Sequence, residues 1–267
     1  MALTRVLVTG AGSGIGRAVC LRVARDAAAR GEAAKIAAVD LASSPGLAGV
    51  AEELKTLGAQ VAAIHADMGT ADGPGRAVAD AVRALGGLDG LVSNAGVNRP
   101  GALKDYKVED WDALFAVNVR ATWLLAKAAH AALTASQGAI VVTGSMSGSN
   151  AHANLGAYGP SKAAVIMLMR VLAQEYGRDG IRVNAVSPGM VRTGMTEPVY
   201  RNPELAKQRD ELVPIGRVAT PEDIADAIVF LLGSDARYVN GHDLVVDGGV
   251  AGNFLGRLPG LSQIPRG

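Results

Sequence analysis

Short apolar segments alternate with longer segments of helical periodicity along most of the chain. The short segments are the predicted strands, Arg5–Thr9, Lys35–Asp40, Val61–Ala66, Gly90–Ser93, Ala139–Thr143, Arg182–Val186 and Asp243–Val246. The longer segments are the predicted helices, Gly14–Arg30, Leu47–Leu57, Asp72–Leu85, Trp111–Thr134, Tyr158–Tyr176 and Pro221–Gly233. Apolar runs without polar alternation are typical of strands that helices cover on both faces. The pattern predicts an α/β fold, a doubly wound parallel sheet of about seven strands with helices on both faces.

The alternation continues without interruption to Val250 in a chain of 267 residues. No charge block, low-complexity linker or internal repeat divides it. Folds of the α/β class commonly reach about 250 residues as one unit. We therefore expect residues 1–250 to form a single domain and residues 251–267 to be its C-terminal tail.

The composition argues against several classes of protein. The 26 Lys and Arg residues nearly balance the 25 Asp and Glu residues, so we expect neither nucleic acid nor a membrane as a partner. The single cysteine, Cys20, cannot form an intramolecular disulfide, and no signal-peptide pattern begins the chain, which predicts a cytoplasmic protein. Four scattered histidines lack the spacing of metal ligands, so we expect no metal site: His65, His130, His152 and His242.

Glycine is frequent, with 34 residues, and several glycines are grouped where the first strand meets the first helix. The run is Thr9-Gly10-Ala11-Gly12-Ser13-Gly14-Ile15-Gly16. Glycines at such a turn let backbone N–H groups approach a pyrophosphate at the positive end of the helix. Strand, glycine turn and helix together predict a Rossmann-type dinucleotide site. Its expected contacts are Gly10, Ser13, Gly14, Ile15 and Gly16.

Asp40 ends the second predicted strand, where a carboxylate can accept hydrogen bonds from both ribose hydroxyls of adenosine and repel a 2′-phosphate. Neither Ser13 nor the residues that follow Asp40 supply a cation for that phosphate. The sequence therefore favours NAD over NADP. The spacing from Gly16 to Asp40 is 24 residues, against about 20 in the usual fingerprint. We expect the extra residues in segment 25–34, as an extension of the first helix or its loop.

Further polar residues follow the third and fourth predicted strands. Asp67 and Met68 come after the third, and Asn94-Ala95-Gly96 comes after the fourth. Ligands of open α/β sheets bind at the carboxyl ends of the strands. We expect Asp67 to accept a hydrogen bond from an adenine amino group. We expect Asn94, Ala95 and Gly96 to turn the chain beside the same cofactor.

Tyr158 and Lys162 are four residues apart, so on a helix they share one face. A neighbouring ammonium favours the phenolate and is expected to lower the pKa of the tyrosine from about 10 toward working pH. At that pKa the phenol can take a proton from an alcohol and return it. The pair predicts acid/base chemistry.

With these motifs in order, the chain resembles the short-chain dehydrogenase/reductase family, in its main single-domain branch, from about Arg5 to Gly249. The resemblance places the catalytic Asn on Asn118, the Ser on Ser145, thirteen residues before the Tyr, and the Tyr-x-x-x-Lys on Tyr158 and Lys162. The segment Pro188-Gly189-Met190-Val191-Arg192-Thr193 is similar to the loop that holds the nicotinamide carboxamide. From it we expect cofactor contacts at Pro188, Gly189, Val191 and Thr193.

The resemblance also implies roles for these residues and an assembly. Tyr158 would be the acid/base, and Lys162 would lower the pKa of Tyr158 and bind the nicotinamide ribose. Ser145 would donate to the substrate oxygen; Ser147 is a nearby alternative that the thirteen-residue spacing disfavours. Asn118 would position a water in a proton relay to Lys162. Hydride would pass between the substrate carbon and the nicotinamide, and by analogy the chain would form a homotetramer.

The substrate is the least determined part. The principal candidates for its pocket are Ser145, Met146, His152, Leu155, Met190 and Met195, and further candidates are Val97, Asn98, Asn150 and Asn154. This mainly apolar set suits a medium-sized apolar or aromatic secondary alcohol or its ketone, with residues 196–212 as a lid. The tail, residues 251–267, is a hypothetical cover of a pocket.

Three other functions stay open. A 3-oxoacyl carrier-protein reductase would normally use NADPH and a basic docking patch, which Asp40 and the balanced charge disfavour. A sugar or polyol dehydrogenase would need a more polar pocket. A non-catalytic dinucleotide-binding sensor would not need the complete set of Asn118, Ser145, Tyr158 and Lys162.

Overall fold

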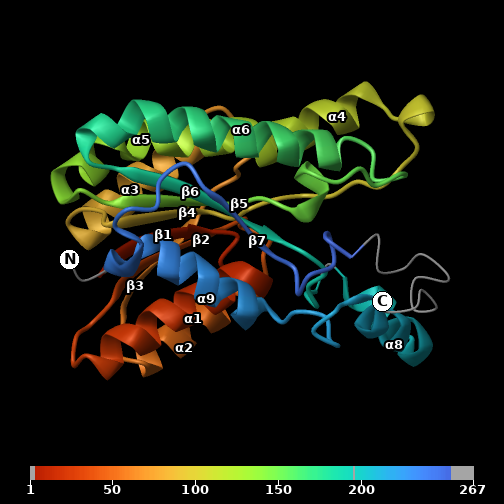
Figure 1. Ribbon diagram of the computed structural model, residues 1–267. Helices are drawn as coiled ribbons and strands as arrows, with labels where there is room; N and C mark the ends of the chain where they lie inside the picture. Colours follow the sequence, from red (N-terminus) through yellow and green to blue (C-terminus); the bar gives the residue numbers. More distant parts are fainter. Residues whose placement is uncertain (1–3, 195, 254–267) are drawn as a thin grey trace, which may run out of the picture.

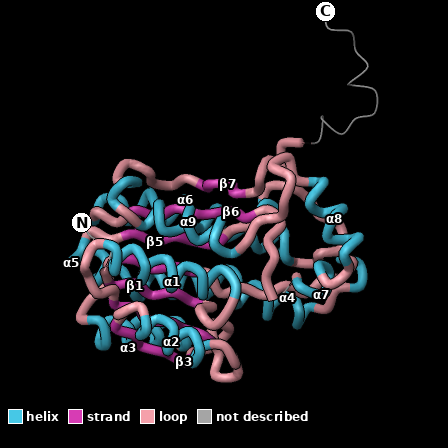
Figure 2. Tube along the Cα trace, turned by 90° about the horizontal axis from the view of Figure 1, so that it is seen from below, coloured by secondary structure: helices cyan, strands magenta, loops and turns pink. Residues whose placement is uncertain are grey.

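The computed structural model describes residues 4–194 and 196–253. Its seven strands form one parallel sheet in the order β3-β2-β1-β4-β5-β6-β7. The strands are β1 Arg5–Thr9, β2 Lys35–Asp40, β3 Gln60–His65, β4 Gly90–Ser93, β5 Ala139–Thr143, β6 Arg182–Pro188 and β7 Asp243–Val246. Figure 2 shows the strands side by side from β7 to β3. The predicted doubly wound sheet is confirmed; β3 begins and ends one residue earlier than predicted, and β6 extends to Pro188.

Helices cover both faces of the sheet (Figure 1). On one face lie α1 Gly14–Ala29, α2 Leu47–Thr56 and α9 Pro221–Leu232; on the other lie α3 Gly73–Leu85, α4 Val108–Phe115, α5 Ala121–Ser136 and α6 Tyr158–Tyr176. Each face buries its own apolar cluster, around Val6 and Val8 on the first and around Leu7 and Val39 on the second. Alternate residues of one strand therefore point into different cores, which explains why the strand sequences are apolar throughout.

The predicted helix Trp111–Thr134 is wrong as a single α-helix. The chain forms α4, then a π-helical turn at Ala116–Arg120, then α5, which runs on to Ser136. A π turn holds one residue more than an α turn, so the side chains before and after it point in different directions than they would in a continuous α-helix. Such turns are frequent at functional sites. Asn118 lies inside this turn and is buried.

Two further helices occur in the segment expected to be a lid. They are α7 Glu197–Tyr200 and α8 Pro203–Leu212, and Asn202 caps α8 by accepting from the backbone N–H groups of Glu204 and Leu205. Figure 2 shows both helices beyond one end of the sheet. They pack there through a small apolar cluster of Tyr200, Val213 and Val218.

The extra residues before Asp40 divide between helix and loop. Helix α1 runs to Ala29, and residues 30–34 connect it to β2. Within residues 4–194 and 196–253, no helix combines the length and the hydropathy needed to cross a bilayer.

One buried carboxylate fastens the start of β1 to the start of β4. Asp89 Oδ2 accepts from the backbone N–H of Arg5 at 2.8 Å and from Thr4 Oγ1 at 3.0 Å, and its Oδ1 accepts from Arg5 Nε at 3.1 Å. Burial opposes ionisation of Asp89 most strongly, but the hydrogen bonds from Arg5 and Thr4 together outweigh it, and the pKa of Asp89 is lowered.

We expect Asp89→Asn to lower the free energy of unfolding by about 2 kcal/mol at pH 7, because it removes the negative charge that faces the Arg5 guanidinium. A carboxylate with a lowered pKa stabilises the fold above its ordinary pKa of 3.8. The difference between wild type and variant should therefore begin to shrink below that value and disappear as the pH falls through the lowered pKa of folded Asp89. Urea unfolding at several pH values measures it. The exposed Asp235→Asn is the control, and equal stability of both variants at pH 7 would contradict the prediction.

Candidate active site

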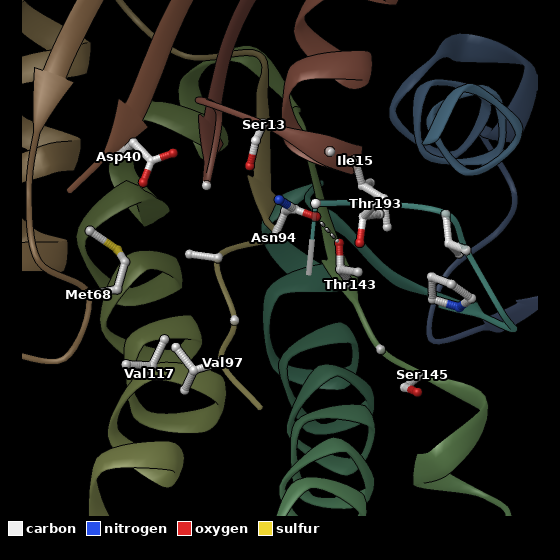
Figure 3. Close-up of a pocket in the computed structure, with 18 of the residues that line it drawn as sticks. Ser13, Ile15, Asp40, Met68, Asn94, Val97, Val117, Thr143, Ser145 and Thr193 are labelled. Atoms are coloured by element: carbon white, nitrogen blue, oxygen red, sulfur yellow. Dashed lines mark hydrogen bonds between the residues drawn. The ribbon is translucent and has the colours of Figure 1, made fainter. Parts of the chain in front are cut away.

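A cleft of about 380 Å³ lies at the carboxyl ends of the strands, across the point where β1 separates β2 from β4. Figure 3 shows Asp40 and Met68 toward one end and Ser145 toward the other. The predicted cofactor residues that line it are Gly10, Ser13, Gly14, Ile15, Asp40, Asp67, Met68, Asn94, Ala95, Gly96, Tyr158, Lys162, Pro188, Gly189, Val191 and Thr193. Residues predicted from the sequence thus form much of the wall of one continuous cleft.

Gly16 is the exception, because it lies behind the cleft and not on its wall. A Cβ at Gly16 would stand 2.1 Å from the carbonyl oxygen of Gly10 and 2.8 Å from Asn94 Nδ2. Glycine is needed there so that α1 can pack directly against the turn after β1. The expectation that Gly16 contacts the cofactor stays a prediction, and the structure adds this packing role.

The carboxylate of Asp40 is fixed by two backbone donors. Its Oδ2 accepts from the N–H of Gly12 at 2.7 Å, and its Oδ1 accepts from the N–H of Leu41 at 2.8 Å. The glycine turn and the end of β2 are thereby joined at the edge of the cleft. Among the described residues that line the cleft, Lys162 is the only basic side chain, and it belongs to the opposite end.

Three strand ends are joined by threonine and asparagine side chains. Thr9 Oγ1, at the end of β1, accepts from the backbone N–H groups of Asn94 and Ala95, both at 3.0 Å. Asn94 Nδ2 donates to the Thr9 carbonyl at 3.0 Å, and Asn94 Oδ1 accepts from Thr143 Oγ1 at 3.1 Å. Figure 3 shows the Asn94–Thr143 bond in the middle of the cleft. The role of Thr143 was missed from the sequence, although its place at the end of a predicted strand was a usable signal.

Lys162 lines the cleft but is almost completely buried, with 5% of its surface exposed. Its Nζ donates to the Thr143 carbonyl at 2.7 Å and lies 5.7 Å from the centre of the Tyr158 ring. Burial lowers the pKa of Lys162 to about 8. The ammonium is still mostly protonated at pH 7, since that pH lies below this value.

Tyr158 begins α6 and faces Ser145 across the cleft wall. Burial raises the pKa of Tyr158, and a hydrogen bond with the Ser145 hydroxyl opposes that rise without cancelling it. The expectation of a lowered pKa is therefore wrong for the chain alone. The reason is physical: burial disfavours the phenolate and also reduces the charge on its lysine neighbour.

Ser145 is distinguished from Ser147 by its partners. Ser145 Oγ accepts from the backbone N–H of Ser147 at 3.1 Å, which leaves its own hydrogen free to donate. Ser147 Oγ instead lies 2.7 Å from Nδ1 of His152. The geometry therefore agrees with the choice of Ser145 as the serine that faces Tyr158.

The amide of Asn118 is held by other parts of the chain. Its Oδ1 accepts from the N–H of Val97 at 2.9 Å, and its Nδ2 donates to the Val97 carbonyl at 3.0 Å and to Ser161 Oγ at 3.1 Å. Asn118 thus fixes the segment after Gly96 against the start of α6. Its expected part in a water relay stays a prediction.

Of the predicted substrate residues that the structure describes, Ser145 and Val97 line the cleft and the others do not. Met146 lies in the 3₁₀ turn after Ser145, His152 is exposed beside Ser147, and Leu155 pairs with Gly101. Met190 packs against the Tyr200 cluster under α7 and α8.

The remaining residues predicted for the substrate side include Asn98 and some that lie outside the described ranges. Met195 and tail residues 254–267 lie outside the described residues. Asn98, next to Val97, has a buried Oδ1 with no hydrogen-bond partner in the described chain. Among the residues that the structure describes, no three His, Cys, Asp or Glu side chains are grouped as a metal site would require.

Comparisons with known proteins agree with this architecture. A family model described as enoyl-(acyl carrier protein) reductase matches residues 10–251. The 2-(S)-hydroxypropyl-CoM dehydrogenase 3 of Xanthobacter autotrophicus is 40% identical over 251 residues, which cover 92% of this chain and 95% of that protein. The mouse (3R)-3-hydroxyacyl-CoA dehydrogenase is 38% identical, with 91% of this chain and 95% of that protein covered.

Solved structures are similar over almost the whole chain. The Pseudomonas aeruginosa RhlG/NADP complex superposes with a TM-score of 0.85 at 28% identity, covering 94% of this chain and 97% of that one. A short chain dehydrogenase of Burkholderia cenocepacia, in complex with NADP, gives a TM-score of 0.83 at 34% identity, covering 94% and 99%. With the sheet, the cleft and these relatives taken together, the chain belongs to the short-chain dehydrogenase/reductase family and is an oxidoreductase of that family.

Proposed function

We propose that the protein transfers hydride between NAD(H) and a secondary alcohol or its ketone, with Tyr158 as the acid/base. The observation that carries the proposal is the meeting of Ser145, Tyr158 and Lys162 at one end of the cleft whose other end holds Asp40. A dinucleotide fits this cleft, because the glycine turn exposes backbone N–H groups at the start of α1 and Asp40 stands at the ribose position. The bound cofactor would accept or supply the hydride.

Each residue has a defined part in the oxidation direction. The Ser145 hydroxyl, free to donate, orients the alcohol oxygen, and Tyr158 Oη removes its proton as the hydride leaves the carbon. The Lys162 ammonium, fixed by the Thr143 carbonyl, stabilises the phenolate that forms. In the reverse direction Tyr158 returns the proton and Ser145 stabilises the charge that develops on the carbonyl oxygen.

Asp40 supports NAD as the cofactor. Its carboxylate is held at the cleft edge by Gly12 and Leu41, and no described lining residue near it is basic. A 2′-phosphate would meet a negative charge with nothing to compensate it. Several structural neighbours are nevertheless NADP complexes, so the preference needs a direct test.

For the substrate, we propose a medium-sized apolar or aromatic secondary alcohol or ketone. Val97 and Val117 line the cleft, and Met146 and Leu155 lie on the loop that joins Ser145 to Tyr158. An acyl-thioester substrate is the second candidate, because the relatives include hydroxyacyl-CoA dehydrogenases and the matching family model is described as an acyl carrier protein reductase. A panel of steroid, aryl, acyl-thioester and sugar substrates separates the two.

We also propose a cytoplasmic homotetramer. On the outer sides of α5 and α6, Trp123, Met167 and Val171 are 46%, 55% and 45% exposed, which is unusual for large apolar side chains on adjacent helices. Burying these side chains between copies of the chain would remove that apolar surface from water.

Tyr158→Phe removes the acid/base hydroxyl while keeping the ring. We expect turnover of any active substrate to fall about a hundredfold or more, while NADH binding, measured by fluorescence titration, stays within about twofold. Tyr176→Phe, at the other end of α6, is the matched control. Near-normal turnover by Tyr158→Phe would refute the assignment, and tight NADH binding without turnover by wild type would favour a sensor.

Asp40→Asn removes the charge but keeps an acceptor for Gly12. We expect the ratio of kcat/KM with NADP to that with NAD to rise at least about tenfold, because like-charge repulsion of the 2′-phosphate is lost. Asp67→Asn should weaken both cofactors alike, since the adenine amino group proposed as its partner is common to both. An unchanged ratio in Asp40→Asn would contradict the proposed preference.

Met167→Glu places a charge at the proposed interface. Light scattering after gel filtration should show four chains in wild type and smaller species in the variant, because a charge buried between subunits is strongly unfavourable. Leu205→Glu on α8 should leave the assembly unchanged. A monomeric wild type would refute the tetramer without affecting the proposed chemistry.

A further inference from the structure

We propose that Tyr106 is a positioning residue for Tyr158, because its ring holds together the two loops from which the catalytic end of the cleft is built. The proposal rests on the proposed function, since it assigns Tyr106 a part in placing the acid/base. Tyr106 lies just before α4 and belongs to none of the motifs found in the sequence.

The two loops pair through their backbones. Gly101 donates its N–H to the Asn154 carbonyl at 2.9 Å, and Gly156 donates to the Gly101 carbonyl at 2.9 Å. The first loop follows Val97, which lines the cleft. The second loop joins Ser145 to Tyr158. The pair therefore connects the two sides of the catalytic end.

The ring of Tyr106 lies against both glycines of this pair. A Cβ at Gly156 would stand 2.1 Å from Tyr106 Cε2, and a Cβ at Gly101 would stand 3.3 Å from Tyr106 Cδ2. The Tyr106 hydroxyl donates to the Arg99 carbonyl at 2.8 Å, which fixes the ring on the first loop. Gly156 also has a φ of +54°, so its backbone conformation and its contact with the ring both require glycine.

We call the Tyr106 ring and the two glycines that it contacts, Gly101 and Gly156, the clamp. The clamp is connected to Tyr158 through one short segment. The backbone N–H of Tyr158 donates to the Leu155 carbonyl at 3.1 Å, and Leu155 is the residue that bridges to Gly101. The start of α6 is therefore set by the position of the segment under the Tyr106 ring. Displacements of about 1 Å at a reacting group can reduce turnover a hundredfold, so a loosened clamp should affect chemistry directly.

General packing does not account for Tyr106. It is only partly buried, and it is a member of neither apolar cluster that packs against the sheet. Tyr176, by contrast, packs against the cluster on the α6 face and contacts the His130 ring at the other end of α6. Tyr176→Leu thus removes a tyrosine with a packing role from α6, the helix that Tyr158 begins, and this makes it the matched control.

The experiment compares Tyr106→Leu, Tyr106→Phe and Tyr176→Leu with wild type. We expect kcat of Tyr106→Leu to fall about ten- to a hundredfold while the Kd for NADH changes less than about twofold. Tyr106→Phe keeps the ring contact and should stay within about threefold of wild type. Tyr176→Leu should lower the melting temperature but not kcat below that temperature.

A second readout needs no substrate. The ultraviolet absorbance of the tyrosines is titrated against pH in each protein and in the same protein that also carries Tyr158→Phe. The difference between the two curves is the titration of Tyr158 alone. Because burial is the largest cause of the raised pKa of Tyr158, admitting water in Tyr106→Leu should move the titration toward lower pH. Tyr176→Leu should leave it in place.

The outcomes are separable. If Tyr106→Leu folds, keeps kcat and leaves the Tyr158 titration unchanged, or if Tyr106→Phe is as impaired as Tyr106→Leu, the proposed clamp is wrong. If wild type turns over no alcohol or ketone, the proposed function fails, and the titration still decides whether the ring positions Tyr158.

Discussion

The strand order reverses at β1, and the active site exists because of that reversal. The chain leaving β1 enters α1 on one face of the sheet, whereas the chain leaving β4 continues toward α4 and α5 on the other. The two connections diverge, and a cleft opens between them at the carboxyl ends of the strands. Thr9 limits how far they separate, since its hydroxyl accepts from two N–H groups of the segment after β4. The width of the cleft is therefore limited by the hydrogen bonds between the Thr9 hydroxyl and the backbone N–H groups of Asn94 and Ala95.

Burial determines the charge state of the residues on that framework. Lys162 Nζ donates to the Thr143 carbonyl, and burial lowers its pKa. The pKa of Tyr158 is raised for the same reason. Both groups therefore favour their neutral forms more than they would in water, and the phenolate becomes favourable only where positive charge is added or water enters. In the chain by itself, burial thus favours the protonated form of Tyr158, which is the form that can donate a proton.

The sequence predicted the sheet well because its signal is local. An apolar run such as Ala139–Thr143 is buried along its full length, so its composition alone identifies it. The π turn at Ala116–Arg120 was missed because an inserted residue hardly disturbs an apolar periodicity read over two dozen positions. Most residues predicted to bind the cofactor line the cleft because their positions depend on strand ends, which the pattern also locates. The packing role of Gly16 was missed because a close approach between backbones and a contact with a ligand both require glycine.

Most residues predicted for the substrate pocket lie off the cleft wall, for a reason that the contacts make clear. Met190 packs under α7 and α8, and Leu155 pairs with Gly101, more than fifty residues away along the chain. Such positions follow from contacts between loops, and no periodicity within one segment reveals them. The cofactor side is built from strand ends that structures only 28% identical can share at a TM-score of 0.85. The loops can therefore differ between relatives while the sheet and the glycine turn stay in place.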